Sequence, residues 1–441
     1  MGGTCKNCAI GVERRQGQGR GGIRLCLFFL FICAAFSCVF FSAQNIFVYK
    51  ARLAEADARS FYNAERSGRG RFDARENCEI FNPPEDECED ECAKSLQSVQ
   101  KGSGAIVIEQ STRRILFAEN KDQKLFPAST TKILTALVAI ENLPLDAPVK
   151  IPKQAVGIEG SSIYLREGET LTVKELLLGL MLRSGNDSAV ALALAVRPTI
   201  EEFCALMNER AKLAGAQNSN FKNPHGLHDD EHYTTAFDLA LITADAFKHA
   251  SFREIVKTKS AVLSGVEEKR YIQNKNKILW RYEGANGVKT GYTKMSGRCL
   301  VASAERAGMQ IISVVLNRGA MWEDTMINMN YAFAAYKMAP LYENLTTKIS
   351  VQNGKTAQFT AKAEDAPRFP VRSDGSEKID VEFLTGRAKA PVKTGKECGE
   401  VKVYLENRLL FSGKLYSMEN VEKKTLRDKI DEFFKRKESS S

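Results

Sequence analysis

The chain has 441 residues, with 63 Lys and Arg against 54 Asp and Glu, a formal net charge of +9, and 44% hydrophobic residues. This length is sufficient for two or three domains with real cores. The basic residues are spread along the chain without a dense stripe or an RNA-type aromatic motif. We therefore expect no nucleic-acid binding, and a surface compatible with anionic membrane or wall polymers.

Residues 1–24 form a basic N-terminus, which precedes an uncharged apolar run over Leu25–Phe41. A basic flank before such a run predicts a signal peptide or a signal anchor over 25–43, and it argues against a buried core helix. The run is at the lower limit for a bilayer-spanning helix, and bulky Phe41 fits poorly before a cleavage after Ala43. We favour an anchor, with most of the chain outside the cytoplasm.

Residues 44–100 are a polar and acidic stretch without a clear hydrophobic pattern, and we interpret them as a solvated linker. Its acidic run contains Cys78, Cys88 and Cys92. Outside the cytoplasm two of these three cysteines could pair as a disulfide.

Ser129-Thr130-Thr131-Lys132 follows Pro127, and apolar residues with helical spacing come next. This pattern predicts a helix that begins near Ser129, with Lys132 one turn later on the same face. A buried lysine near other cations loses proton affinity, so Lys132 could take the proton of Ser129. The alternative is a capping serine followed by a solvated lysine.

Ser184-Gly185-Asn186 separates two helical patterns, over Leu171–Leu182 and Asp187–Val196. A break of this kind can direct a hydroxyl and an amide into a cleft. A helix stop followed by an Asn cap explains the same residues equally well.

Three of the four histidines, His225, His228 and His232, lie close together beside acidic residues. Their spacing matches no ligand motif on a helix, so we do not expect a zinc site.

Lys289-Thr290-Gly291 opens a strand pattern, which continues as a hairpin over Cys299–Ala304 and Gln310–Leu316. Such a basic strand can present Lys289 and Thr290 to a carboxylate, and Gly291 leaves room for a substrate backbone. The alternative is an ordinary polar turn before a hairpin.

The pattern becomes β-rich over 343–418, with strand-like alternation in Lys348–Thr360, Lys378–Leu384 and Glu400–Leu405. A basic amphipathic helix is predicted within 419–441, and Leu426, Ile430, Phe433 and Phe434 share its apolar face. Such a helix suits an anionic bilayer surface, although it could also dock on the β-rich part.

An SxxK, an SxN and a KTG in this order are the parts of a serine acyl-transferase that works without histidine. From about Ser103 to about Leu415 the chain resembles the serine-type D-alanyl-D-alanine carboxypeptidases, the low-molecular-mass penicillin-binding proteins. The resemblance also rests on further segments, namely Phe126–Lys132, Gly160–Leu165, Leu182–Asp187, Asn223–Leu227, Tyr233–Ala236 and Gly287–Thr293.

The resemblance implies an α+β fold. A transpeptidase/β-lactamase-like catalytic domain over 101–342, with an antiparallel sheet flanked by helices, would precede a small all-β domain.

The resemblance also implies an acyl-enzyme mechanism without a metal or an organic cofactor. Ser129 would attack the bond between two terminal D-alanines, with Lys132 as its base, and Ser184 would pass a proton to the leaving amine. The remaining residues would bind the substrate. Asn186 would hold its peptide backbone, and Lys289 and Thr290, beside Gly291, would bind its terminal carboxylate. The backbone N–H groups of Ser129 and Tyr292 would form the oxyanion hole. His225 would pack in the family's loop near the active site.

The expected function is removal of the terminal D-Ala from peptidoglycan stem peptides, in cell-wall maturation outside the cytoplasm. β-Lactam antibiotics would be covalent inhibitors, and the membrane would be contacted through the N-terminal segment and the C-terminal helix. Two alternatives are a β-lactamase, disfavoured by SGN in place of SDN and by the C-terminal β-rich part, and a catalytically inactive wall-binding protein.

Overall fold

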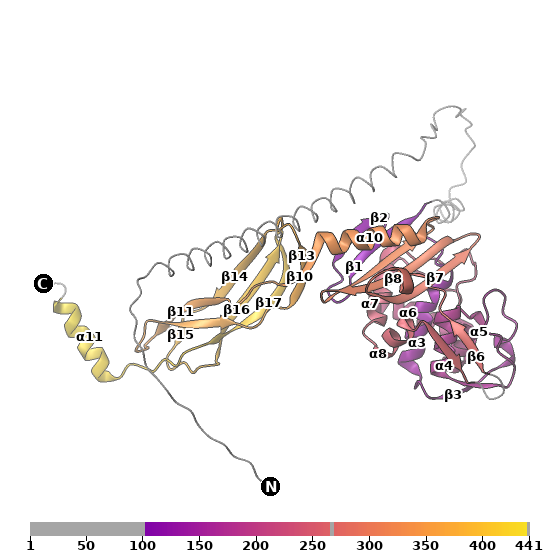
Figure 1. Ribbon diagram of the computed structural model, residues 1–441. Coiled ribbons are helices and arrows are strands. Elements are labelled where there is room, and N and C mark those ends of the chain that lie inside the picture. The colour runs from indigo at the N-terminus through magenta and orange to yellow at the C-terminus, as the bar shows by residue number, and fades with distance from the viewer. Residues whose placement is uncertain (1–101, 265–268, 439–441) are drawn as a thin grey trace, which may run out of the picture. The chain divides into compact units, whose positions relative to one another are not determined.

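The computed structural model of the protein describes residues 102–264 and 269–438 (Figure 1). The basic N-terminus, the signal or anchor segment and the linker with its three cysteines lie outside the described residues. Within the described ranges, no helix is long and apolar enough to cross a bilayer.

A five-stranded antiparallel sheet forms the centre of the larger α+β part, in the order β2-β1-β9-β8-β7. Its strands are β1 (Gly104–Glu109), β2 (Ile115–Glu119), β7 (Ala285–Thr293), β8 (Gly297–Arg306) and β9 (Met309–Leu316). The predicted hairpin is therefore confirmed as β8–β9. The KTG segment lies in the middle of β7, because the strand begins four residues earlier, at Ala285.

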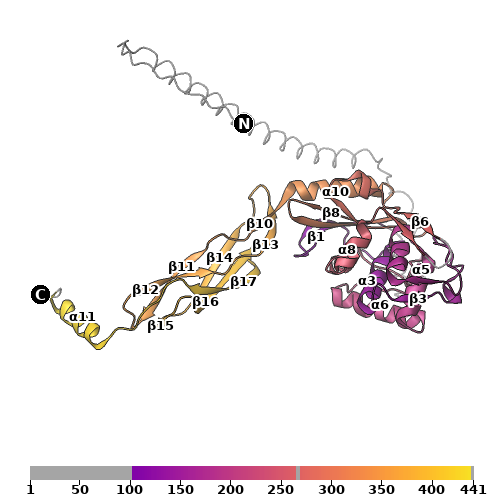
Figure 2. The ribbon, with the colours of Figure 1, turned by 60° about the horizontal axis from the view of Figure 1, so that its bottom comes forward.

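The sheet is buried on both faces, so alternate residues of each strand enter different cores. In β1, Ala105 and Val107 pack into the core that contains α10 (Met321–Ala335). Ile106 and Ile108 point the other way, into the larger core beneath α7 (Ala236–Ala246) and α8 (Ala250–Lys257). Figures 1 and 2 show α10 on one face of the sheet and the helices of the larger core on the other.

The helices of the larger core are α3 (Lys132–Asn142), α4 (Val173–Leu178), α5 (Asn186–Val196), α6 (Ile200–Ala214), α7 (Ala236–Ala246) and α8 (Ala250–Lys257). Ile278 of the short α9 (Ile278–Arg281) packs into the core that contains α10. The prediction of one helix over Leu171–Leu182 was wrong. Thr172 and Glu175 form a capping box that begins α4 at Val173, and Gly179–Arg183 continue as a π-helix. Two small hairpins pair β3 (Pro148–Lys150) with β4 (Thr170–Thr172), and β5 (Ser260–Leu263) with β6 (Arg270–Gln273).

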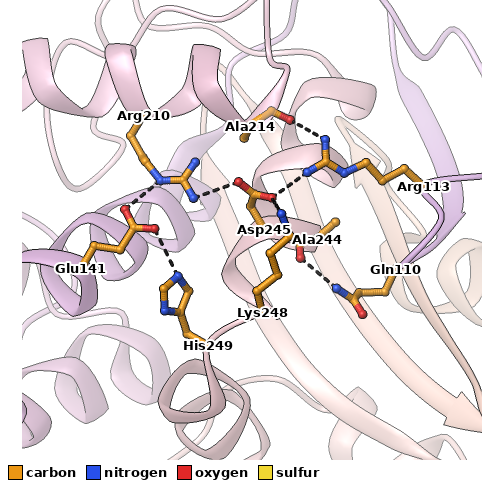
Figure 3. Close-up of polar contacts among 9 residues, drawn as sticks. All are labelled: Gln110, Arg113, Glu141, Arg210, Ala214, Ala244, Asp245, Lys248 and His249. Carbon is orange, nitrogen blue, oxygen red and sulfur yellow. Dashed lines mark hydrogen bonds and ion pairs between the residues drawn. The ribbon is translucent and has the colours of Figure 1, made fainter.

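An ion-pair cluster ties three of these helices to the turn between β1 and β2 (Figure 3). Asp245 of α7 pairs with Arg113 at 2.6 Å, with Arg210 at 2.8 Å and with Lys248 at 2.6 Å. Arg210 of α6 also contacts Glu141 of α3 at 2.7 Å. The Asp245 side chain is 7% exposed, so this cluster is a structural element of the helical layer.

The C-terminal part is all-β, as predicted. Its six-stranded sheet has the order β14-β16-β17-β12-β11-β15 around a core that includes Ile349, Phe359 and Leu415. The strands of this sheet are β11 (Thr346–Gln352), β12 (Gln358–Ala363), β14 (Ile379–Thr385), β15 (Ala388–Lys389), β16 (Glu397–Leu405) and β17 (Arg408–Ser417). The strands β10 (Tyr336–Pro340) and β13 (Arg368–Arg372) pair with each other as a separate two-stranded sheet. The amphipathic helix predicted within 419–441 is α11 (Leu426–Glu438).

Candidate active site

A cavity of about 410 Å³ lies between the turn before α3, the end of the π-helix and the end of β7. Three of the predicted site residues, Ser129, Asn186 and Tyr292, line it directly. Its other lining residues are Gly160, Ser161, Ser162, Tyr164, Arg183, His225, Gly226, Leu227, Lys275 and Thr293. Hydroxyls, amides and cations therefore dominate its wall, which suits a polar and anionic ligand.

Ser129 lies in a turn of 3-10 helix, Ala128–Thr131, and Lys132 begins α3 directly after it. The Lys132 side chain is completely buried, and its Nζ lies 3.0 Å from Ser129 Oγ. The same Nζ donates to Asn186 Oδ1 at 2.7 Å and to the His225 carbonyl oxygen at 2.6 Å. Both carbonyl oxygens can only accept, so a neutral amine uses its two N–H groups there and directs its lone pair at the Ser129 hydroxyl.

The pKa of Lys132 lies well below its ordinary value. Burial is the largest cause, and the charges of Lys289 and Lys275 lower the pKa further, whereas Asp187 raises it. A lysine without its proton near neutral pH can act as a general base, and its contact with Ser129 meets the geometric requirement for that role.

Ser184 and Asn186 enter the site because the π-helix ends there. Ser184 has a φ of 65°, in the left-handed region, and Asn186 is the first residue of α5. Asn186 Nδ2 donates to the Glu159 carbonyl oxygen, so both ends of its amide are held while its Oδ1 accepts from Lys132. Ser184 is 5% exposed as a residue, and its hydroxyl makes no hydrogen bond among the described residues.

Lys289, Thr290 and Gly291 lie on β7, the edge strand that faces the turn of Ser129. Lys289 is 1% exposed, and its Nζ donates to the Thr290 carbonyl oxygen at 2.9 Å. Burial, with a further contribution from Lys275, lowers the pKa of Lys289 to about 7. A Cβ at Gly291 would lie 3.1 Å from the Ser129 nitrogen, so this glycine lets the strand approach the turn.

The loop over Asn223–Leu227 supplies a contact that the sequence did not reveal, the His225 carbonyl oxygen on Lys132. A backbone carbonyl can accept a hydrogen bond whatever side chain its residue carries, so the identity of residue 225 does not predict this contact. The following glycine, Gly226, was the sequence feature that could have indicated a close approach of the backbone. Gly226 has a φ of +84°, and a Cβ there would lie 1.8 Å from the Ala128 carbonyl oxygen. The loop therefore presses against the turn that carries Ser129.

The histidines make separate contacts. His225 Nδ1 accepts from the Leu227 N–H at 3.2 Å, and His232 Nε2 contacts Thr131 Oγ1 at 2.8 Å. His228 lies 3.2 Å from Asp230. The sequence predicted that His225 packs near the active site. In the structure, both His225 and His232 pack there.

Comparison with known proteins identifies the same two parts. The family model described as D-alanyl-D-alanine carboxypeptidase matches residues 92–320. The model described as the C-terminal domain of penicillin-binding protein 5 matches residues 336–423.

Individual relatives extend this similarity over most of the chain. D-alanyl-D-alanine carboxypeptidase DacF of Bacillus subtilis is 31% identical over 344 residues, which cover 75% of this chain and 88% of the relative. DacC of Escherichia coli is 30% identical over 340 residues, which cover 72% of this chain and 83% of the relative.

Solved structures have the same fold. The carboxypeptidase DacD of Francisella tularensis superposes with a TM-score of 0.58 at 26% identity, over 81% of this chain and 99% of that one. A variant of the Streptomyces K15 DD-transpeptidase gives 0.50 at 35% identity, over 52% of this chain and 97% of that one. With the paired Ser129 and Lys132 at its centre, the chain belongs to the D-alanyl-D-alanine carboxypeptidase family of penicillin-binding proteins.

Proposed function

We propose that Ser129 is the nucleophile and Lys132 its general base. The observation that supports these roles is the 3.0 Å contact of Lys132 Nζ with Ser129 Oγ, while two carbonyl oxygens occupy the other positions around Nζ. Ser129 Oγ bonds to the carbonyl carbon of the peptide between two D-alanines, and its proton passes to Lys132 Nζ. The proton then moves through the Ser184 hydroxyl to the leaving amine as the C–N bond breaks.

The substrate is held by residues of β7 and by the start of α5. Lys289 and Thr290 bind the terminal carboxylate, and Gly291 allows the peptide to lie close to the strand. The N–H groups of Ser129 and Tyr292 stabilise the oxyanion, and Asn186 orients both Lys132 and the peptide. Water then attacks the ester, Lys132 takes its proton and returns it to Ser129, and the shortened peptide leaves.

The chain is a serine-type D-alanyl-D-alanine carboxypeptidase, a hydrolase of the penicillin-binding protein class. The family acts on peptidoglycan stem peptides and binds β-lactams, and this substrate implies that the chain acts outside the cytoplasm. In this chain the β-lactam adduct forms on Ser129, because a strained lactam amide presents the same carbonyl to the nucleophile.

The test is release of D-alanine from a peptide that ends in D-Ala-D-Ala, with the full chain and with a Ser129→Ala variant. The native chain is expected to release D-alanine and to be acylated by penicillin, whereas the variant does neither. Release by the variant at the native rate would assign the nucleophile to another residue.

We also propose that α11 contacts the membrane. Leu426, Ile430 and Phe434 are 81%, 54% and 60% exposed and recur every four residues, so they form one apolar face on a basic helix. The full chain should co-sediment with anionic vesicles more than with neutral ones, and a Leu426→Gln/Ile430→Gln variant should lose part of this binding. Equal binding of both chains would remove α11 from the interaction.

A further inference from the structure

A second cavity, of about 500 Å³, adjoins the one that contains Ser129. The two cavities share two lining residues, Arg183 and Lys275, so the second is an extension of the active-site region. The rest of its wall is formed by Gln273, Asn274, Lys277, Trp280 and Arg281.

Cations dominate this second cavity. Arg183, Lys275, Lys277 and Arg281 are four of its seven lining residues, and none of the seven is acidic. Within 102–264 and 269–438, none of these four cations forms an ion pair with a carboxylate. Burial, and then the charge of Arg183, lowers the pKa of Lys275, which is the expected effect of crowding like charges. An unneutralised positive cavity attracts an anion.

The segment Gln273–Lys277, which forms part of the lining of the second cavity, is held by hydrogen bonds to the protein interior. Side chains alternate over Gln273–Lys277, with the odd-numbered residues exposed and Asn274 and Asn276 buried. Asn274 Nδ2 donates to the Thr258 carbonyl oxygen at 3.0 Å, and the Lys275 N–H donates to the Leu182 carbonyl oxygen at 3.0 Å. These contacts fix the backbone from which Lys275 and Lys277 project.

Trp280 adds an apolar surface to this cationic wall. Its side chain is 46% exposed, and Lys259 Nζ lies 5.8 Å from its ring centroid. The indole therefore offers a surface for the aliphatic part of a ligand whose charged end faces the cations. A carboxylate on a short aliphatic chain has both parts.

We propose that this cavity is a subsite for a second carboxylate of the stem peptide, upstream of the D-Ala-D-Ala bond. The inference rests on the proposed function, in which Lys289 and Thr290 bind the terminal carboxylate. A carboxypeptidase substrate ends at that group, so a further carboxylate on it lies upstream. The shared residues Arg183 and Lys275 make the second cavity accessible to a peptide bound beside Ser129.

The test compares matched substrates that end in D-Ala-D-Ala. In the first pair, the residue directly before D-Ala-D-Ala is diaminopimelate in one peptide and its side-chain amide in the other. In the second pair, the residue two positions before D-Ala-D-Ala is isoglutamate in one peptide and isoglutamine in the other. The variant Lys277→Gln/Arg281→Gln changes two residues that line the second cavity and not the first. Lys153→Gln/Lys174→Gln removes the same charge from two exposed residues that line neither cavity.

In at least one pair, the native chain and the control variant should cleave the peptide with the carboxylate with a kcat/KM about tenfold higher than that for the matched amide peptide. In the cavity variant this preference should fall to about twofold or less, with the amide peptide cleaved at the native rate. Equal cleavage of both members of each pair by the native chain would overturn the subsite and leave the peptidase function intact. A cavity variant that keeps the native preference would also overturn it.

Equilibrium binding of the same peptides to the Ser129→Ala variant separates the two proposals. Should the native chain release no D-alanine, a carboxylate preference in binding that requires Lys277 and Arg281 would still support the subsite. No preference in binding and no release would reject both the subsite and the peptidase mechanism.

Discussion

Thr131 Oγ1 lies 2.8 Å from His232 Nε2, directly beside the residue that contacts Ser129. The Lys222 N–H donates to His232 Nδ1 at 3.1 Å, so Nε2 carries the proton and donates it to Thr131. Burial, and then the charge of Lys132, lowers the pKa of His232 to about 3. His232 is therefore a neutral donor that fixes the turn of Ser129.

Thr131→Val tests this contact, because it removes the hydroxyl and keeps the shape. The His232 N–H would remain buried without an acceptor, which should cost about 1–3 kcal/mol in the free energy of unfolding. Thr243→Val is the matched control, since its hydroxyl is also buried but donates within α7 to the Leu239 carbonyl oxygen at 2.7 Å. Thermal unfolding should show the larger loss for Thr131→Val, and equal losses would contradict the assigned role.

Lys132→Met should slow acylation by penicillin by about 10²–10⁴-fold, because it preserves an unbranched buried side chain and removes the base. Stopped-flow or mass-spectrometric adduct formation on Ser129 measures the rate. A rate near that of the native chain would exclude Lys132 as the base.

The activity should depend on pH through two lysines. Protonation of Lys132 removes the base, so kcat/KM rises with pH as this lysine loses its proton. Lys289 has a pKa of about 7, so above that pH it loses the charge that binds the substrate carboxylate, and kcat/KM falls.

Bound substrate stabilises the Lys289 ammonium, so the alkaline decrease of kcat should lie at higher pH than that of kcat/KM. A Lys289→Arg variant keeps its charge and should lack this decrease. An unchanged alkaline decrease in that variant would assign it to another group.

Gly226→Ala should disrupt the site through a backbone clash. Its Cβ would lie 1.8 Å from the Ala128 carbonyl oxygen, in the turn of Ser129. Gly308→Ala is the control, because it has a similar φ of +74° but nothing within 4 Å of the added Cβ. We expect about 1 kcal/mol of destabilisation for the control and at least about 3 kcal/mol for Gly226→Ala. Chemical unfolding compares them, and equal values would exclude the clash.

Asp245→Asn should destabilise the fold by about 1–3 kcal/mol at neutral pH, because Arg113 loses its carboxylate whereas Arg210 keeps Glu141. Burial alone raises the pKa of Asp245, but bonds from Lys248 and Arg210 lower it overall. A lowered carboxyl pKa means that the stabilisation is present above the unfolded-state pKa and is lost as pH falls through the folded-state value.

The difference between the native chain and Asp245→Asn should therefore shrink in acid. Asp230→Asn is the control, since its side chain is 70% exposed and, within the part of the chain that the structure describes, forms an ion pair only with His228. A loss for Asp245→Asn as small as that of the control would show that the cluster contributes little.

The sequence predicted what depends on short-range geometry. Ser129 and Lys132 are three residues apart at a helix start, so local backbone geometry alone brings their side chains to one face. The β-prone runs over Cys299–Ala304 and Gln310–Leu316 likewise predicted the hairpin β8–β9. The helix over Leu171–Leu182 was misjudged, because apolar spacing does not distinguish an α-helix from a capped α-helix that continues as a π-helix.

Tertiary structure decided the environment of the base. Asn186 and the His225 carbonyl lie 54 and 93 residues from Lys132 in the chain, and they reach its Nζ because α5 and the Asn223–Leu227 loop pack against α3. The cationic cavity likewise joins Arg183 to a segment about ninety residues later. Burial and nearby charges lower the pKa of Lys132, and both depend on how the whole chain packs. The sequence therefore identifies the reactive residues, whereas the tertiary structure determines their protonation and contacts.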